Sequence, residues 1–439
     1  MKWRYFAALI AALWTSAAAA QPIAEAVGAG FEVERYSVAL SPKRAGKSVT
    51  GTERITIRSV RDGLRSIVFS PNALTIDHAA VGGRDTSVAS DATGIAIALP
   101  SPLRRGQTVT ISLRYHGVPK RGVTATATSM YTSYFACDWM ICLQDAPGDK
   151  AWFDLDLRVP SGMTSLAAGR MVGRTAASGG AAIHRWRSTR PYSAYLFGFA
   201  IGPFTRATEP AAGAELTYYG EGARAAELKQ LFAETPHMVT FLSGKAGLPL
   251  PDGRFAQLLV PGREAQEAAT YSLIGRGELE RSAADPSSDW VIVHELAHQW
   301  WGNLVTAQTW HHFWLNEGIT TFMTAAWKEH RYGAAAYRAE LDTARQRLAR
   351  AREAGWDRPL AFAGSYPDLR MRRAIQYSKG ALFMDYLRTL LGEQAFWSGL
   401  KAFTQRHAGG SVTSTDFQRA MEKAAKRNLS ATFKDWVFG

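Results

Sequence analysis

The stretch VIVHELAHQWWGN, residues 291–303, constrains the fold of this chain more than any other part of the sequence. If residues 289–302 are helical, His294 and His298 project from one face of the helix, one turn apart. Two imidazoles placed in this way can bind one metal ion. Glu295 follows the first histidine and can hydrogen-bond a water on that metal without being a ligand, which is the position of a general base.

A second stretch, WLNEG at residues 314–318, supplies the third ligand that such a site needs. A helix that begins near Asn316 would carry Glu317, and eighteen residues separate Glu317 from His298, enough for the first helix to end and the chain to return. Two histidines, one carboxylate and an open fourth position are the composition of a hydrolytic zinc site. The alternative is an ordinary buried helix whose histidines bond to backbone carbonyls, and the downstream glutamate argues against it.

HELAHQWWGN followed by WLNEG resembles the zinc aminopeptidases typified by aminopeptidase N and the leukotriene-A hydrolase, members of the gluzincin metallopeptidases. The resemblance implies one Zn²⁺ per chain, bound by His294, His298 and Glu317, with Glu295 as the base. It also extends to the N-terminal half, because ICLQDAPGDKAWFDLDL at residues 141–157 is similar to a family segment in which a cysteine and Asp-x-Pro precede an aromatic strand.

The same resemblance assigns roles to two further residues. GREAQEAATYSLIG, residues 262–275, occupies the place of the family's Gly-x-Met-Glu-Asn motif, where only Glu267 matches and Ala268 stands for the asparagine. That glutamate binds the free α-amino group of the substrate in the family. Tyr377, in QYSKG, resembles the tyrosine of the family's Tyr-x-Lys-Gly motif, which implies a hydrogen bond to the developing oxyanion. The alternatives are an exposed loop glutamate and a tyrosine that serves packing.

The first twenty residues predict a signal peptide. Lys2 and Arg4 provide a positive start, residues 5–14 an apolar run, and residues 18–20 a small-residue cleavage site. The apolar run is too short for a membrane anchor, and no other stretch reaches the roughly 18 residues that a span needs. We therefore expect export to a periplasm or secretion, and no integral membrane segment in the mature chain.

The fold class expected is α+β and multidomain. Residues 21–205 predict an N-terminal antiparallel β domain, since apolar and polar residues alternate at 31–40, 49–57, 108–115 and 152–159. Turns are expected at residues 41–42, 82–83 and 160–162. Residues 206–439 predict a mainly helical, thermolysin-like catalytic domain, with helices expected at 223–247, 334–353 and 376–392.

The two cysteines, Cys137 and Cys142, would meet an oxidising compartment after export. Four intervening residues permit a disulfide without requiring it, and two buried thiols are the alternative. A metal site here is not expected, because no histidine is near.

The formal charge of +13 does not indicate nucleic-acid binding. The basic residues are scattered, with no run of five or more and no nucleic-acid motif. A cationic surface of this kind suits an anionic envelope or solubility.

The sequence ends where relatives of this family usually carry a further large helical domain. We therefore expect the active-site cleft to be more open than in those relatives, or to be closed by another chain. That chain could be a second copy of this protein.

The function expected is hydrolysis of the N-terminal peptide bond of peptides by metal-activated water. One alternative is an endopeptidase of the same fold, favoured by the altered motif around Glu267. The other is a non-catalytic peptide-binding or partner-binding protein, which would not need His294, Glu295, His298, Glu317 and Tyr377 all to be present.

Overall fold

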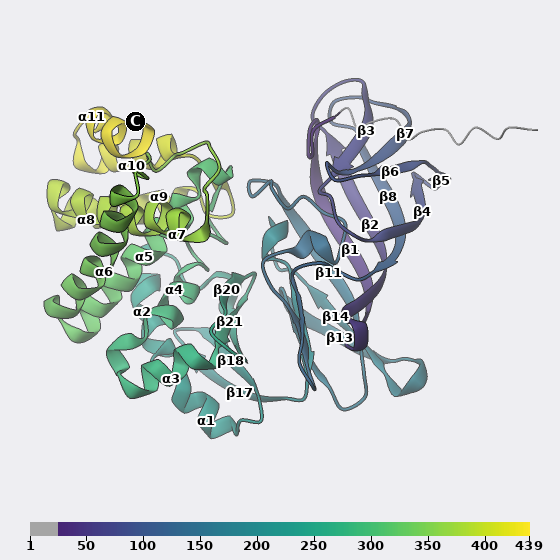
Figure 1. Ribbon diagram of the computed structural model, residues 1–439, viewed down its shortest axis with the longest axis horizontal. Coiled ribbons are helices and arrows are strands. Elements are labelled where there is room, and N and C mark those ends of the chain that lie inside the picture. Colours follow the sequence, from purple (N-terminus) through teal and green to yellow (C-terminus); the bar gives the residue numbers. More distant parts are fainter. Residues whose placement is uncertain (1–24) are drawn as a thin grey trace, which may run out of the picture.

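The computed structural model describes residues 25–439, apart from the side chains of Ala283 and Pro286. The predicted signal peptide, residues 1–20, lies outside the described residues. A β domain and a mainly helical domain follow one another along the chain and pack side by side (Figure 1). The expected fold class is therefore confirmed.

The β domain is built on a large mixed sheet with strand order β13-β14-β11-β1-β2-β8-β4-β5, in which β15 also pairs with β11. Most neighbours are antiparallel, but β1 and β11 run parallel. The strands of this sheet are β1 (Phe31–Lys43), β2 (Ser48–Ser59), β4 (Thr75–Val81), β5 (Arg84–Asp85), β8 (Thr108–Gly117), β11 (Lys150–Val159), β13 (Arg170–Ala176), β14 (Ala182–Arg187) and β15 (Tyr192–Ser193).

Two smaller sheets complete this domain. One has the order β3-β7-β6 and the other β12-β16-β10-β9. Their strands are β3 (Leu64–Phe69), β6 (Val88–Ser90), β7 (Ile95–Leu103), β9 (Val123–Ala125), β10 (Met130–Thr132), β12 (Thr164–Ala167) and β16 (Phe199–Gly202).

Strand β1 shows why the alternating pattern predicts a strand here, and where the predicted turn is wrong. Its apolar side chains face the core, and a register shift between Val33 and Arg35 moves the buried positions from odd to even numbers. We expected a turn at residues 41–42, but Pro42 pairs with Val49 and the strand continues to Lys43. Beyond Leu40 the described pairings of β1 are with β2 alone, so Pro42 lies where one side of the strand is unpaired, as a proline needs.

Of the two states that the sequence leaves open, the structure has the disulfide between Cys137 and Cys142, and both residues are buried. The backbone of this segment is held from two sides. Asn72 Nδ2 donates to the Cys137 carbonyl over 2.8 Å, and Glu53 Oε2 accepts from the Ile141 amide over 2.9 Å. The disulfide segment is therefore part of the core of the β domain.

The helical domain begins with a five-stranded sheet of order β17-β18-β19-β21-β20. These strands are β17 (Phe204–Ala211), β18 (Ala214–Glu221), β19 (Arg254–Val260), β20 (Ala265–Ala268) and β21 (Tyr271–Gly275). The last strand of the β domain, β16, ends at Gly202, and the first strand of the helical domain, β17, begins at Phe204. The domain boundary that we propose, after residue 205, lies close to this point.

Helices form most of the rest of this domain, together with the short paired strands β22 (Thr306–Ala307) and β23 (Ser411–Val412). The helix expected at 334–353 has those bounds, whereas the stretch 223–247 forms two helices and the stretch 376–392 begins in a π-helical segment. The helices are α1 (Ala225–Leu231), α2 (Thr235–Ala246), α3 (Arg276–Ala284), α4 (Trp290–Ala297), α5 (Trp314–Tyr332), α6 (Ala334–Glu353), α7 (Leu369–Arg372), α8 (Gly380–Leu391), α9 (Glu393–Arg406), α10 (Ser414–Ala425) and α11 (Ser430–Phe433). A π-helical segment, Arg373–Lys379, joins α7 to α8. Within residues 25–439, no helix combines the length and the apolar character needed to cross a membrane.

Candidate active site

The two histidines of the HELAH stretch meet on α4. The helix is shorter than expected, because it ends at Ala297 and His298 is its C-terminal cap. His298 nevertheless keeps helical dihedral angles, φ −56° and ψ −24°, so it still lies one turn beyond His294. The Nε2 atoms of the two rings are 3.2 Å apart.

Glu317, in the first turn of α5, is the third member of a triangle of side-chain atoms, which we call the zinc triangle: His294 Nε2, His298 Nε2 and Glu317 Oε2. Its Oε2 lies 3.4 Å from His294 Nε2 and 3.5 Å from His298 Nε2. A tetrahedral zinc site with ligands at about 2.0–2.1 Å has ligand atoms about 3.3–3.4 Å apart. The three buried side chains therefore have the spacing of zinc ligands, as predicted from the two stretches.

The charged groups around the zinc triangle also favour the binding of a cation. Burial opposes charging of His298, but Glu267, Glu317 and Glu295 outweigh it and raise its pKa to about 10. Burial alone would raise the pKa of Glu317, but the neighbouring histidines lower it instead. Oε2 of Glu295 and Oε2 of Glu317 are buried and have no hydrogen-bond partner among the described residues. A divalent cation would take the place of the proton on His298 as the positive charge among these carboxylates, and it would supply the partner that the two Oε2 atoms lack.

The turn after α4 fixes the orientation of the second histidine. His298 Nδ1 lies 3.1 Å from the Trp301 carbonyl oxygen, so Nδ1–H donates there and Nε2 keeps its lone pair for a metal. Gly302 follows with φ +135°, and a Cβ at this position would lie 2.8 Å from His298 Nδ1. The glycine of the WWGN sequence is thus required by the close approach of the backbone to the ring.

Glu267 lies on β20 at the edge of the five-stranded sheet, so the exposed-loop alternative is wrong. Carboxylate and imidazole atoms of Glu267, Glu295 and His298 lie within 4.8 Å of one another. Burial and the charge of Glu317 raise the pKa of Glu267 to about 7, although His298 opposes this rise. Gln299 and Asn303 both donate side-chain amides to the Ala268 carbonyl, over 3.2 and 2.9 Å, and so hold β20 against the end of α4.

Tyr377 lies in the π-helical segment and faces the same site. Its ring stacks on that of His294, with centroids 6.0 Å apart and planes 12° apart. Burial and the charge of Glu317 raise the pKa of the Tyr377 phenol well above its usual value. The hydroxyl therefore keeps its proton at neutral pH and can donate a hydrogen bond.

A contact between two glycines brings Glu317 and Tyr377 together. Gly318 follows Glu317 on α5, Gly380 begins α8, and a Cβ on Gly318 would lie 2.8 Å from the Cα of Gly380 and 3.1 Å from the Gln376 carbonyl oxygen. The two helices can approach this closely because neither residue has a side chain. Both glycines belong to the sequences NEG and YSKG, but nothing in either sequence indicates that they touch.

We expect Gly318→Ala to lower kcat/KM by about 10²-fold, because the added methyl group meets backbone and must push α5 away from α8. Glu317 and Tyr377 would then lose their relative position. Gly244→Ala on α2 is the matched control, since a Cβ there meets nothing within 4 Å. Peptide hydrolysis and zinc content would be measured for both variants, and unchanged activity in Gly318→Ala would show that the contact does not position the site.

The β domain contributes residues that the sequence did not indicate. Tyr134 has φ +57°, its amide donates to Gln266 Oε1 over 2.8 Å, and its hydroxyl donates to the Ala265 carbonyl over 2.5 Å. Tyr134 thus lies against β20, next to Glu267. Lys150, at the start of β11, donates to the carbonyls of Asn303 and Leu304 over 3.1 and 2.8 Å.

Two arginines that precede Tyr377, Arg372 and Arg373, also lie at the site, and the sequence analysis did not identify them. The Arg372 guanidinium lies over the rings of Phe313 and Trp310, 5.0 and 5.6 Å from their centroids. The charge of Arg373 opposes the rise in the pKa of Glu295 that burial and the nearby carboxylates cause. Their only signal in the sequence is the pair of basic residues ahead of the tyrosine motif.

Comparisons with known proteins agree with this geometry. Residues 270–436 match the Peptidase family M1 domain. Leukotriene A-4 hydrolase from Xenopus laevis is 26% identical over 92% of this chain and 70% of its own length. Aminopeptidase N from Lactococcus lactis subsp. lactis is 24% identical over 93% of this chain. The chain spans about half the length, 51%, of that aminopeptidase.

Solved structures share the whole two-domain fold. An M1 zinc metallopeptidase from Deinococcus radiodurans superposes with a TM-score of 0.80 at 24% identity, and the match covers 93% of this chain and 94% of that one. A two-domain M1 zinc metallopeptidase variant bound to L-tryptophan gives a TM-score of 0.77 at 24% identity, over 94% and 96% of the two chains. Residues 270–436 therefore match the Peptidase family M1 domain, and the chain has the two-domain fold of the solved M1 zinc metallopeptidases.

Proposed function

We propose that this chain is an M1 zinc metallopeptidase and an aminopeptidase, which removes the N-terminal residue of peptides. The observation that carries the proposal is the place of Glu267. Its half-buried carboxylate lies beside His298 and Glu295. A carboxylate next to the hydrolytic centre suits the positive α-amino group of a free N-terminus, whose charge would favour the ionised form of Glu267.

His294, His298 and Glu317 would hold the zinc ion, since they have the spacing, burial and charge described above. When bound, the ion polarises the scissile carbonyl and makes water a stronger nucleophile. Glu295 takes a proton from the attacking water and passes it to the nitrogen of the leaving amine. Burial raises the pKa of Glu295, and the charges of Glu267 and Glu317 add to the rise, which makes its carboxylate a stronger base than an exposed one.

Tyr377 and Glu267 position the substrate in this proposal. The Tyr377 hydroxyl donates a hydrogen bond to the carbonyl oxygen as negative charge develops on it, a contribution that grows toward the transition state. Glu267 pairs with the α-ammonium and so fixes one residue ahead of the scissile bond. The β20 strand that carries Glu267 is fixed by Gln299 and Asn303, so its carboxylate has little freedom to move.

We expect Glu267→Ala to cost roughly 2–4 kcal/mol in kcat/KM toward substrates with a free N-terminus. This corresponds to a loss of about 30-fold to 900-fold. Hydrolysis of N-acetylated peptides, which carry no ammonium, should change far less. The assay would compare aminoacyl arylamides and blocked peptides, with zinc content measured in each variant.

Glu264→Ala is the matched control for this experiment. Glu264 lies three residues earlier, and its charge acts on Tyr131 and Tyr134 rather than on the zinc triangle. Its loss should leave the preference for free N-termini intact. If both substrate types decline together in Glu267→Ala while zinc stays bound, Glu267 supports the structure of the site and does not bind the amine.

An endopeptidase of the same fold is the second candidate. The observation in its favour is that Gln266 and Ala268, on either side of Glu267, depart from the family's motif, and that Gln266 is engaged by the Tyr134 amide. An endopeptidase would cut N-acetylated peptides as fast as free ones. Equal rates would therefore replace the aminopeptidase proposal by this one.

We also propose that the protein is exported to a periplasm or secreted. The predicted signal peptide supports this location, and so does the disulfide between Cys137 and Cys142, which persists in oxidising compartments. Fractionation of expressing cells, with N-terminal sequencing of the product, would test it. Recovery of the chain with its first twenty residues intact in the cytoplasm would contradict it.

A further inference from the structure

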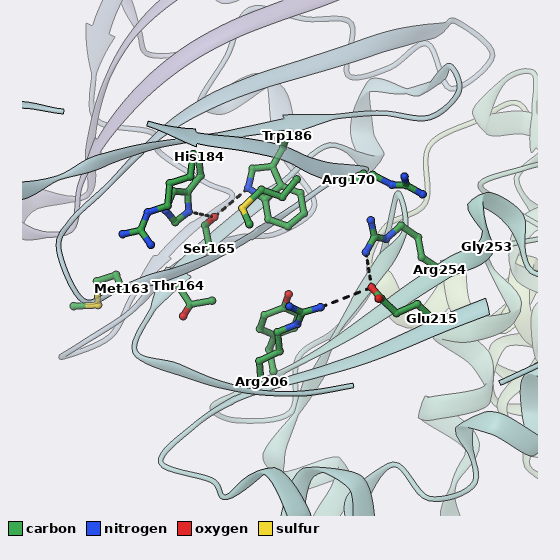
Figure 2. Close-up of a pocket in the computed structure, with 13 residues that line it drawn as sticks. Met163, Thr164, Ser165, Arg170, His184, Trp186, Arg206, Glu215, Gly253 and Arg254 are labelled. Carbon is green, nitrogen blue, oxygen red and sulfur yellow. Dashed lines mark hydrogen bonds and ion pairs between the residues drawn. The ribbon is translucent and has the colours of Figure 1, made fainter. Parts of the chain in front are cut away.

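A cavity of about 590 Å³ lies between the two domains, away from the proposed zinc site. Its lining comes from β12, β13 and β14 of the β domain and from β17, β18 and the start of β19 of the helical domain (Figure 2). The outer strands of the five-stranded sheet are β17 and β20. The cavity lies over β17, β18 and the start of β19, whereas Glu267 lies on the opposite edge strand, β20. The two edge strands are four strand spacings, about 19 Å, apart.

Arginines dominate the charge of this cavity. Arg170 and Arg174 come from β13, Arg206 from β17 and Arg254 from β19, whereas Glu215 is the one acidic residue among the described lining. Glu215 lies 2.7 Å from Arg254 and 3.8 Å from Arg206, so two guanidiniums share one carboxylate. Within residues 25–439, neither Arg170 nor Arg174 has a carboxylate partner. The lining thus holds a formal excess of three positive charges.

The buried side chain of His184 adds an unused hydrogen-bond donor to the lining. Its Nδ1 lies 2.7 Å from Ser165 Oγ, which also accepts from Trp186 Nε1 over 3.0 Å (Figure 2). The indole N–H donates to Ser165 Oγ, and among the described residues His184 Nδ1 is the one acceptor within reach of the Ser165 hydroxyl hydrogen, so we assign that hydrogen to a bond with Nδ1. Burial and the charge of Arg174 lower the pKa of His184, so the ring is neutral and carries its one hydrogen on Nε2.

Nε2 of His184 is buried and has no partner among the described residues. A buried donor without an acceptor is unfavourable until a ligand accepts its hydrogen bond. The four guanidiniums and this N–H are all donors, and all of them suit an acceptor that carries negative charge. The cavity also has the size of ordinary small-molecule sites, about 300–1,000 Å³.

We propose that this cavity binds a small soluble organic anion, whose phosphate or similar doubly charged oxyanion is held by the arginines and by the Nε2–H of His184. Guanidiniums bind such groups through paired hydrogen bonds. Apolar surface from Met163, Met171, Trp186 and Tyr219 suits a compact carbon body on the same ligand. Because the arginines come from both domains, one anion would neutralise positive charge on both sides of the domain interface.

Calorimetric titration of the zinc-loaded full chain tests the proposal. The probes are phenyl phosphate, inorganic phosphate and phenol, at constant ionic strength. We expect phenyl phosphate to bind with one site per chain and more tightly than inorganic phosphate, and phenol to give no measurable binding. Zinc content measured before and after the titration would show that the probes do not remove the metal.

Arg174→Gln and Arg206→Gln should each weaken the binding of phenyl phosphate by about tenfold or more. Both side chains are exposed, so the core is unchanged. Arg65→Gln is the matched control, an exposed arginine on β3 at the far end of the β domain (Figure 1), and it should bind as the unmodified chain does. NMR of the ring nitrogens should show the His184 signal shift on binding.

Equal affinity for phenyl phosphate in all four proteins would overturn the proposal, and so would an unchanged His184 signal at saturation. Binding to phosphatidylglycerol vesicles without any binding of the soluble anions would overturn it too, because the site would then recognise a lipid headgroup on a surface.

Discussion

We expect the Glu295→Gln variant to bind zinc almost normally and to turn over peptides about 10²-fold or more slowly. Glutamine keeps the shape of the side chain and leaves His294, His298 and Glu317 in place. An amide cannot accept a proton from water, however, so the proton transfer that accompanies attack is lost. The structure adds a reason for a large effect. Glu295 is buried, and its Oε2 has no hydrogen-bond partner among the described residues, so that oxygen is free to accept.

The measurement is kcat on an aminoacyl arylamide, together with zinc content by elemental analysis. Glu280→Gln is the matched control, because Glu280 is an exposed glutamate on α3 of the same domain. Normal turnover in Glu295→Gln would show that another group is the base. Loss of zinc in this variant would show instead that Glu295 contributes to metal binding.

Much of this site could be predicted from the sequence because its chemistry is local. The four-residue spacing of His294 and His298 places them on one helical face whatever the helix packs against. That argument survives the early end of α4, since His298 keeps helical angles as a cap. Glu317 follows from a different argument, because WLNEG predicts the start of a second helix and the eighteen residues after His298 let the chain return to the site. Apolar periodicity likewise placed α6 at Ala334–Glu353, as expected.

The parts that could not be predicted depend on contacts between distant segments. Tyr134 reaches β20 from the β domain across more than a hundred residues of sequence, and the left-handed backbone that allows it has no signature at a tyrosine. Gly318 and Gly380 touch through helix packing, which single-sequence patterns do not specify. The mistaken turn at residues 41–42 has a similar cause, because the tolerance of Pro42 depends on which side of β1 is left unpaired.

The second large effect concerns the metal itself. Replacing His294 or His298 by alanine removes one of three protein ligands, so we expect zinc content and activity to fall severely in both variants. Loss of a mere hydrogen-bond partner of a ligand already costs about 10–100-fold in metal affinity, and loss of a ligand should cost more. His237→Ala is the control, because His237 is 70% exposed on α2 and pairs with Glu234.

Zinc would be measured after dialysis against a metal buffer, so that weakly held metal is lost. After either substitution the other two ligands remain, and so do the carboxylates of Glu295 and Glu267. The experiment therefore tests whether these remaining groups can hold zinc without the missing imidazole. If those carboxylates took the place of the missing imidazole, both variants would retain full zinc, and the assignment of the histidines as ligands would fail. If zinc falls in both variants and not in His237→Ala, the three atoms that lie 3.2–3.5 Å apart are the ones that hold the metal.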